Sequence, residues 1–333
     1  MNKNTLEPPA AGKTGFFPRI ADGIKGFVLR HRFTLAAYPY VLWMALFVVI
    51  PIVIIVVYAF TSADGSFTLD NFSSMLDYAS VFGRSMWLAI LATVICLLVG
   101  YPVAYVLSKS GPGLQRIGMM LIMLPMWINF LLRTYAWMSL LENTGLINRF
   151  FAAVGIIDLG NLINGGLNGI CAWLNELLGL SLNVQRDTSM EYFQMINTSG
   201  AVVLGMVYNY LPFMIMPIYS VLVKIDKSVI EAAQDLGADS GRVFRKVIFP
   251  LSLSGVVSGI TMVFVPSVST FVISKLLGGG SDMLLGDLIE MQFLTVYNPN
   301  LGSAIAFVMM IIVVICMTVM NKFGEGEEQA VIM

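Results

Sequence analysis

Charged side chains are scarce in this sequence. Asp, Glu, Lys and Arg together make up 12% of its 333 residues, whereas a typical soluble domain contains about 25%. Hydrophobic residues account for 57%, and the mean hydropathy is +0.82. The net charge of −1 lacks the basic excess with which proteins bind nucleic acids. We therefore expect a membrane protein that lies in the lipid bilayer and has no nucleic-acid partner.

Residues for catalysis and metal binding are also few. The chain has one histidine, His31, and its three cysteines, Cys96, Cys171 and Cys316, are too widely spaced for a zinc site or a disulfide framework. There is no HExxH motif and no nucleophile elbow, and no apolar run contains a pair of carboxylates. We expect no catalytic residue, no metal site and no enzymatic activity in this chain.

A phosphate-binding loop is incomplete. The stretch AAGKTG at 10–15 contains the final GKT of that motif, but the glycine required five positions before Gly12 is replaced by Glu7. We therefore expect no nucleotide or other cofactor on this chain.

Long apolar runs dominate the rest of the sequence. About 20 apolar residues in a helix cross a bilayer. The runs that meet this length are Phe33–Phe60, Met86–Leu107, Ile117–Leu141, Gly200–Val223, Leu251–Leu276 and Leu301–Met320. They predict an all-α polytopic membrane protein with six transmembrane helices. The first run is too long for a signal peptide and is read as a retained anchor.

Basic residues predict the orientation of these helices. Fourteen lysines and arginines fall in the two termini and in alternate connections, against three, Arg84, Arg149 and Arg186, on the other side. Positive charge favours the cytoplasmic side, so both termini are expected there. The chain then divides into a cytoplasmic tail at 1–32, a first helix and outer loop at 33–84, a transmembrane domain at 85–321 and a cytoplasmic tail at 322–333.

Arg133 and Lys275 lie within apolar runs near their outer ends, and we expect them to snorkel to the headgroups.

The stretch EAAQDLGADSGRVFRKVIFP, at 231–250, lies within the cytoplasmic connection 224–250. Ser228 and Glu231 have the spacing of a capping box, and Gly237 provides the left-handed residue that ends a helix near Leu236. Asp239 or Ser240 can cap a second helix, and Pro250 would occupy the first turn of the fifth span. These signals predict two short helices with a hinge. The alternative is an ordinary amphipathic surface loop.

This stretch resembles the EAA signature of ATP-binding-cassette importer permeases, E-A-A-x3-G-x9-I-x-L-P. The matching residues are Glu231, Ala232, Ala233, Gly237 and Pro250, whereas Val247 and Phe249 replace the usual Ile and Leu. The resemblance implies that the loop, Asp239 included, forms a coupling helix that docks into a cytoplasmic ATPase. ATP and magnesium would be used by that separate chain.

Three further stretches, at 131–148, 204–222 and 269–293, resemble the spermidine/putrescine branch of these permeases. The resemblance implies a type I importer in a prokaryotic inner or plasma membrane. Its expected partners are two ATP-binding subunits, a second homologous permease and an extracytoplasmic substrate-binding protein.

A polyamine carries several ammonium groups, which bind carboxylates and aromatic faces. Eleven acidic residues fall in the outer connections and could attract a cation, Glu142, Asp287 and Glu290 among them. Our candidates for the substrate path are Trp137, Glu142, Tyr208, Asn209, Tyr210, Ser267, Ser269 and Thr270. For Tyr208 and Tyr210, helix packing is an equal alternative.

The outer connection 142–198 is long enough to have its own structure. Its apolar stretches Arg149–Ile157 and Ile170–Leu180 are too short to span a bilayer and predict interfacial helices or a small cap. The intervening Asn161–Gly169 is rich in Asn and Gly and predicts a loop. We expect this insertion to help dock the substrate-binding protein.

Two alternatives to polyamine import remain at this stage. One is a permease for another small solute, such as iron, thiosulfate, phosphonate or a sugar. The other is an ATP-independent channel or secondary transporter, which would more typically show inverted repeats and buried acidic residues.

Overall fold

A computed structural model describes residues 38–178, 187–280 and 283–331. These ranges are mostly helical, with turns, an irregular segment at 187–198 and one isolated bridge between Thr61 and Phe67. The chain divides into two compact units that meet at residues 57 and 58. The predicted N-terminal tail, the first residues of the first apolar run and Arg186 lie outside the described residues.

The first unit contains most of a single apolar helix. Residues Tyr38–Ala59 are helical, with η1 (Ala45–Val49) followed by α2 (Ile50–Ala59), and they are long and apolar enough to cross a membrane. No residue from 38 to 57 is buried within its own unit. Such a helix is stable where lipid, rather than protein, surrounds its apolar side chains.

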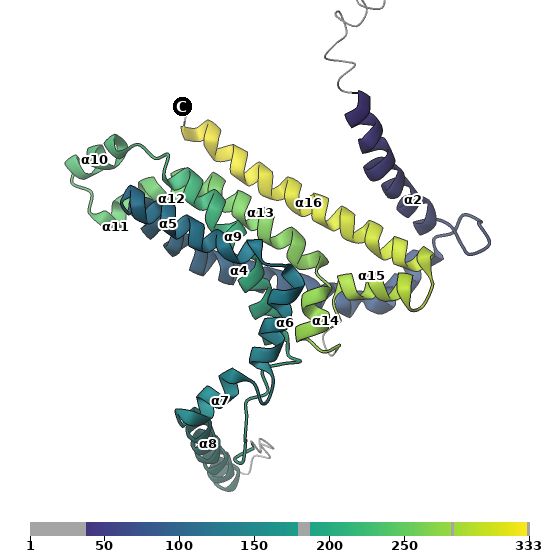
Figure 1. The fold of residues 1–333 in the computed structure, drawn as a ribbon, viewed down its shortest axis with the longest axis horizontal. Coiled ribbons are helices and arrows are strands. Elements are labelled where there is room, and N and C mark those ends of the chain that lie inside the picture. The colour runs from purple at the N-terminus through teal and green to yellow at the C-terminus, as the bar shows by residue number, and fades with distance from the viewer. Residues whose placement is uncertain (1–37, 179–186, 281–282, 332–333) are drawn as a thin grey trace, which may run out of the picture. The chain divides into compact units, whose positions relative to one another are not determined.

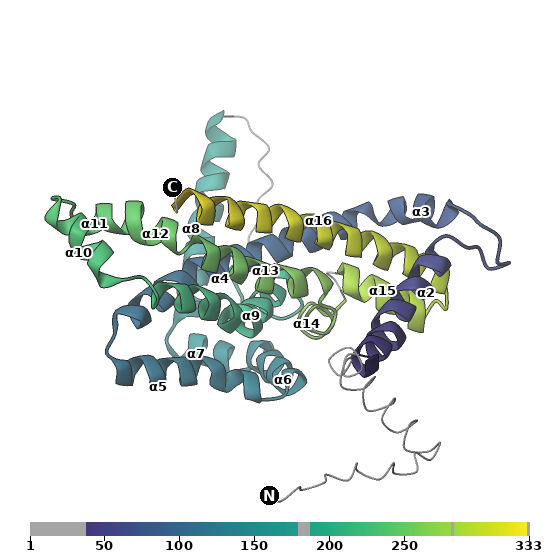
Figure 2. The same ribbon diagram turned by 90° about the horizontal axis from the view of Figure 1, so that it is seen from above.

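The second unit is built around four long helices that lie side by side (Figures 1 and 2): α4 (Ala79–Lys109), α9 (Ser199–Leu222), α13 (Leu253–Ser269) and α16 (Pro299–Val331). Glycines allow the backbones of α9 and α13 to approach closely. A Cβ atom on Gly255 would lie 2.9 Å from the Pro217 carbonyl oxygen, and one on Gly259 would lie 2.8 Å from the Met214 sulfur. Small residues at helix contacts are typical of membrane bundles, where van der Waals packing drives association.

The prediction of six spans is confirmed if each of two bent helix pairs counts as one span. Four helices are long and apolar enough to cross alone, and the other two spans are bent by 90° and 60°. The third run is therefore not one straight helix as predicted: α5 (Pro112–Met123) and η3 (Leu124–Trp127) are separated from α6 (Phe130–Leu141). Pro125 cannot extend the hydrogen-bond ladder, and Asn129 starts α6 by accepting a hydrogen bond from the Leu131 N–H at 2.8 Å.

The fifth run also breaks, because α13 ends at Ser269 and Thr270 has extended backbone angles. Two short helices follow at the end of the bundle opposite α10 and α11 (Figure 1): α14 (Val272–Leu277) and α15 (Leu285–Leu294). The remaining helices are α3 (Asp70–Met75), η2 (Leu76–Tyr78), α7 (Leu146–Ala153), α8 (Ile156–Leu178), α10 (Lys227–Asp235), α11 (Ser240–Val243), η4 (Phe244–Ile248) and α12 (Phe249–Leu251).

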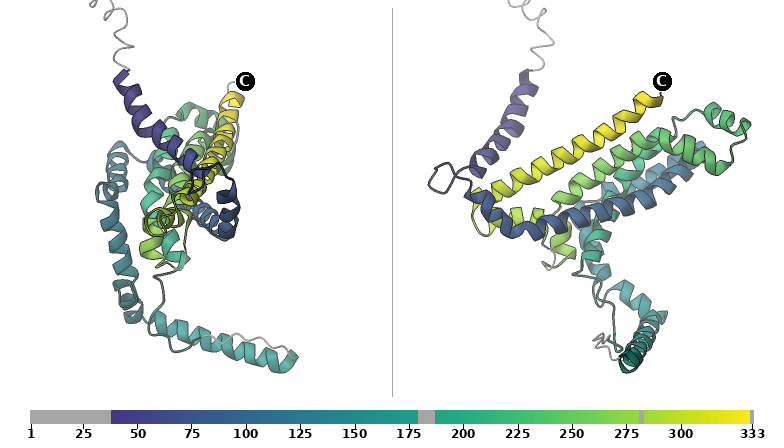
Figure 3. Two further views of the ribbon diagram at one scale, coloured as in Figure 1. Left: turned by 90° about the vertical axis from the view of Figure 1, so that its right-hand side faces the viewer. Right: turned by 180° about the vertical axis from the view of Figure 1, so that it is seen from behind.

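Residues Asn161–Gly169 do not form the predicted loop, because α8 continues through them as one helix that extends away from the bundle (Figure 3). The predicted stretch Arg149–Ile157 is instead divided at Gly155, whose φ is +76°. Asn and Gly have low helix propensity, so their helical state here depends on contacts made by the asparagine side chains, described below.

Candidate coupling loop and substrate path

The connection between α9 and α13 contains the two short helices that the sequence predicts. Their first cap differs from the prediction: α10 begins at Lys227, and Asp226 Oδ1 accepts a hydrogen bond from the Ser228 N–H at 3.0 Å. This bond holds the pKa of Asp226 below its ordinary value. Ser228 is therefore not the cap, and Glu231 is exposed and has no hydrogen bond or ion pair among the described residues.

The hinge between the helices is confirmed. Gly237 has a φ of +82°, and its N–H donates to the Gln234 carbonyl at 2.8 Å while the Ala238 N–H donates to Ala233 at 3.1 Å. This pair of bonds is a Schellman motif, which satisfies carbonyls at the helix end. Asp239 caps α11 by accepting from the Gly241 N–H at 3.2 Å, and it pairs with Arg242.

Pro250 does not begin the fifth span as predicted. It lies inside a continuous helical run from Ser240 to Leu251, and the 60° bend comes after that run. The π-helical stretch η4 precedes it, and the Phe249 N–H bonds to the Phe244 carbonyl. In this π-helical turn each N–H bonds to the carbonyl five residues earlier instead of four. The change in pairing falls next to Pro250, which has no N–H to donate.

The two faces of α10 differ. Ile230 and Ala233 are partly buried and pack toward the bundle core. The adjoining side of the helix contains Val229, Ala232 and Leu236, and Leu236 is 90% exposed. The spacing of i, i+3 and i+7 places these residues on one side of the helix. Val229 and Leu236 were missed as candidates, although this apolar spacing was present in the sequence.

An aromatic cluster attaches the loop to the bundle. The Phe244 ring lies 5.8 Å from the Tyr101 ring and 5.2 Å from the Tyr105 ring, centroid to centroid, and both tyrosines belong to α4. The buried Tyr101 hydroxyl lies 2.8 Å from the Ser252 hydroxyl, at the start of α13. Phe244 thus joins the loop to α4, and Tyr101 joins α4 to the start of α13.

The structure brings some of the substrate-path candidates together. The Trp137 and Tyr208 rings, on α6 and α9, are 5.3 Å apart at an interplanar angle of 66°. The Tyr210 hydroxyl donates to the Pro266 carbonyl at 3.5 Å, and both residues line an apolar cavity of about 780 Å³. The other residues that line this cavity are Met123, Met126, Phe213, Met216, Pro217, Ser220 and Met262.

Other candidates lie apart from this cavity. Asn209 and Ser267 are buried, and each donates a side-chain hydrogen bond to a carbonyl of its own helix, Gly205 at 2.8 Å and Val263 at 2.7 Å. The Asn209 Oδ1 atom has no partner among the described residues. Thr270 is buried at the end of α13, whereas Ser269 and Glu142 are exposed.

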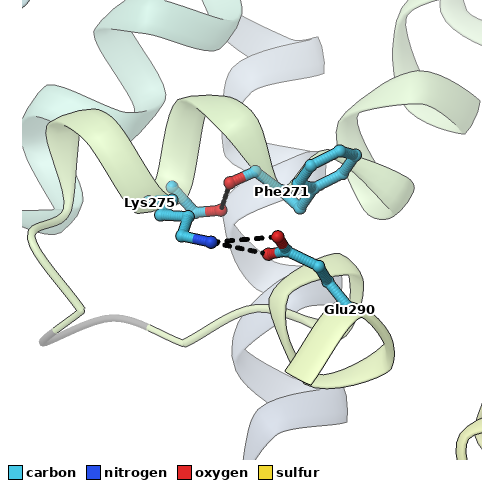
Figure 4. Close-up of polar contacts among 4 residues, drawn as sticks. Phe271, Lys275 and Glu290 are labelled. Atoms are coloured by element: carbon cyan, nitrogen blue, oxygen red, sulfur yellow. Dashed lines mark hydrogen bonds and ion pairs between the residues drawn. The ribbon is translucent and has the colours of Figure 1, made fainter. Parts of the chain in front are cut away.

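The two basic residues in apolar runs do not simply snorkel. Two guanidinium nitrogens of Arg133, Nε and Nη1, are buried without a partner among the described residues, and its Cζ lies 6.0 Å from the centre of the Phe130 ring. Lys275 is paired instead: its Nζ donates to both carboxylate oxygens of Glu290, at 2.9 and 3.0 Å (Figure 4). The sequence-based prediction missed this pair because the partners lie on separate helices.

Asparagine side chains organise the outer insertion. Asn161 on α8 both donates to the Met190 carbonyl and accepts from the Met190 N–H, each at 3.0 Å. Asn148 on α7 makes the same pair of bonds with Phe193, and Asn164 donates to the Asp187 carbonyl at 2.9 Å. The side-chain amides thus bond to backbone N–H and carbonyl groups of residues 187–193. These bonds hold the Asn-rich segment against residues 187–193 while its backbone remains helical.

Comparisons with known proteins agree with this arrangement. Residues 97–325 match the family model for the binding-protein-dependent transport system inner membrane component. The spermidine/putrescine transport system permease protein PotB of Escherichia coli (strain K12) is 32% identical over 278 residues, covering 81% of this chain and 90% of the relative. PotB of Haemophilus influenzae is 32% identical over 272 residues, covering 79% and 84%.

A solved structure shares the fold at lower identity. The bacterial ABC transporter involved in the import of the acidic polysaccharide alginate aligns with a TM-score of 0.65 and 12% identity, covering 91% of this chain and 98% of the other. The chain therefore belongs to the inner-membrane component family of binding-protein-dependent transport systems. It is a transport permease component that crosses the membrane several times.

Proposed function

We propose that this chain is a permease subunit of an ATP-driven importer and that its cargo is a polyamine such as spermidine or putrescine. The observation that carries this proposal is the 32% identity with spermidine/putrescine permeases across most of both chains. The alginate transporter, at 12% identity, supports the fold only.

The proposed coupling element is the pair α10 and α11. The uncovered apolar face with Val229, Ala232 and Leu236 is suited to a groove on a cytoplasmic ATP-binding subunit. Glu231, Gly237, Asp239 and Pro250 shape or flank this element. A displacement of the loop would pass through Phe244 to Tyr101 and Tyr105 on α4, since packed aromatic side chains move together.

The proposed substrate path runs past the aromatic rings of α6 and α9. Trp137, Tyr208 and Tyr210 present π-faces to which an ammonium group is attracted by about 0.5–2 kcal/mol. Weak attraction of this kind suits a solute that must pass rather than remain bound.

The proposed assembly contains two ATP-binding subunits, a second homologous permease and an extracytoplasmic substrate-binding protein. ATP and magnesium would be bound by the ATP-binding subunits. Both termini and α10–α11 would face the cytoplasm of a prokaryotic cell, which places α14, α15 and the α7–α8 insertion on the outer side. The insertion, stiffened by its asparagine contacts, would dock the substrate-binding protein.

A reconstituted complex tests the proposal. Proteoliposomes containing all subunits should take up labelled putrescine or spermidine when ATP is supplied to the cytoplasmic face, but not with a non-hydrolysable analogue. Competition with iron, thiosulfate, phosphonate and sugars separates the alternative cargoes. Uptake of equal rate without ATP would contradict the coupling role and favour a channel or secondary transporter.

A further inference from the structure

The ion pair between Lys275 and Glu290 connects α14 and α15 at the end of the bundle opposite α10. Both oxygens of the Glu290 carboxylate accept from the same ammonium group, at 2.9 and 3.0 Å (Figure 4). Charge-assisted bonds of this length are among the stronger hydrogen bonds in proteins. The structure therefore contains a carboxylate already arranged to hold a primary ammonium ion.

The two partners are unequally exposed. The Lys275 side chain is 62% exposed, and that of Glu290 is 24% exposed. The lysine can therefore rotate into solvent, whereas the carboxylate stays in place on α15. An ion pair with such an exposed partner contributes little net free energy, so a second ammonium group could replace the lysine at low cost.

The lysine side chain is chemically similar to the end of a linear polyamine. It is a primary ammonium on a flexible alkyl stem, and a polyamine ends in the same group. Whatever geometry holds the Lys275 ammonium on Glu290 is therefore suitable for the terminal ammonium of such a solute.

The surroundings of the pair favour a cation. Asp287 lies one turn before Glu290 on α15, and its Oδ1 atom is buried without a hydrogen-bond partner among the described residues. The other Asp287 oxygen, Oδ2, accepts from the Leu284 N–H at 2.9 Å, so two carboxylates lie one turn apart on α15. The Phe271 ring lies beside the pair (Figure 4), directly after the break at Thr270 that ends α13. In the proposed substrate path, the Tyr210 hydroxyl donates to the Pro266 carbonyl, near the same end of α13.

We propose that Glu290 binds an ammonium group of the cargo and that Lys275 occupies Glu290 as a tethered substitute until the cargo displaces it. This inference rests on the proposed polyamine function. Between transport cycles Lys275 pairs with the Glu290 carboxylate. When cargo is present, Lys275 competes with it for the same two oxygens.

Opposite effects of two substitutions test this competition in proteoliposomes containing the complete importer. Glu290→Gln should raise the KM for putrescine about tenfold, the factor expected when a charge-assisted hydrogen bond is lost. Lys275→Ala should lower the KM by up to about fivefold, because the competitor is gone. The double variant should behave like Glu290→Gln alone. Asp77→Asn, which removes an exposed acid elsewhere at the same end, should leave the KM unchanged.

A purely structural ion pair gives a different result. Both single substitutions would then break the same contact and shift the KM in the same direction, and that outcome would overturn the inference while polyamine uptake by the unaltered complex still supported the proposed function. If Glu290→Gln accumulates poorly, Lys275→Ala decides alone: an unchanged or raised KM refutes the competition. Absence of polyamine uptake by the unaltered complex would refute the proposed function and this inference with it.

Discussion

Replacing Leu236 by aspartate should separate docking from folding. Leu236 is the C-cap residue that directly follows α10, and it is 90% exposed in the isolated chain. Val229, on the same face of the helix, is 45% exposed. A large apolar side chain in this position is costly in water unless a partner covers it.

The exposure sets the expected magnitudes. Substitution of an exposed residue typically changes the free energy of unfolding by no more than about 0.5 kcal/mol, so Leu236→Asp should leave the permease stable. If Leu236 enters a groove of the ATP-binding subunit, its burial contributes about 1.5–3 kcal/mol. Its loss would weaken that association by about 10- to 150-fold.

The assay compares two quantities on the same sample. Thermal unfolding of the purified permease complex measures stability, and titration with the ATP-binding subunit in nanodiscs measures affinity. Leu69→Asp is the matched control, because Leu69 is 58% exposed and precedes the first residue of α3, where aspartate is a favourable cap. Wild-type affinity for Leu236→Asp would refute docking through this face.

Three further predictions concern the loop and the insertion. Gly237→Ala should reduce ATP-coupled uptake, because alanine at a φ of +82° is strained by about 1 kcal/mol. Gly237→Asn should retain more uptake than Gly237→Ala, since Asn tolerates this conformation. Equal uptake by the wild type and both variants would contradict a required hinge. Asn161→Ala should speed hydrogen exchange at the Met190 amide, which loses its acceptor, whereas Asn164→Ala should leave that amide protected. Because the folded-state pKa of Asp226 is lowered, its carboxylate contributes to the stability of α10 above pH 3.8, the ordinary value. This stability is lost as the pH falls through the lower folded-state pKa. Asp226→Asn should abolish this part of the acid sensitivity, measured by circular dichroism.

Local signals in the sequence were sufficient for several elements. Hydropathy located four helices that can each cross a membrane and two further spans that the structure bends, since a bilayer requires an apolar run of fixed length. The Gly237 hinge and a second cap at Asp239 or Ser240 followed from backbone preferences that act within a few residues, and the structure uses Asp239. The same reasoning chose Ser228 over Asp226 as the first cap, because helix starts are uncertain by one or two residues when several capping side chains are adjacent.

The tertiary structure decided what depends on residues distant in sequence. Composition predicted a loop at Asn161–Gly169, but hydrogen bonds to residues 187–193 stabilise a helix there. Lys275 and Glu290 lie on different helices, so no periodicity in the sequence could pair them. Leu236 could be recognised as uncovered only once Ile230 and Ala233 were seen to face the core. Hydropathy and capping are properties of neighbouring residues, whereas ion pairs, bends and exposed faces arise when separate helices pack.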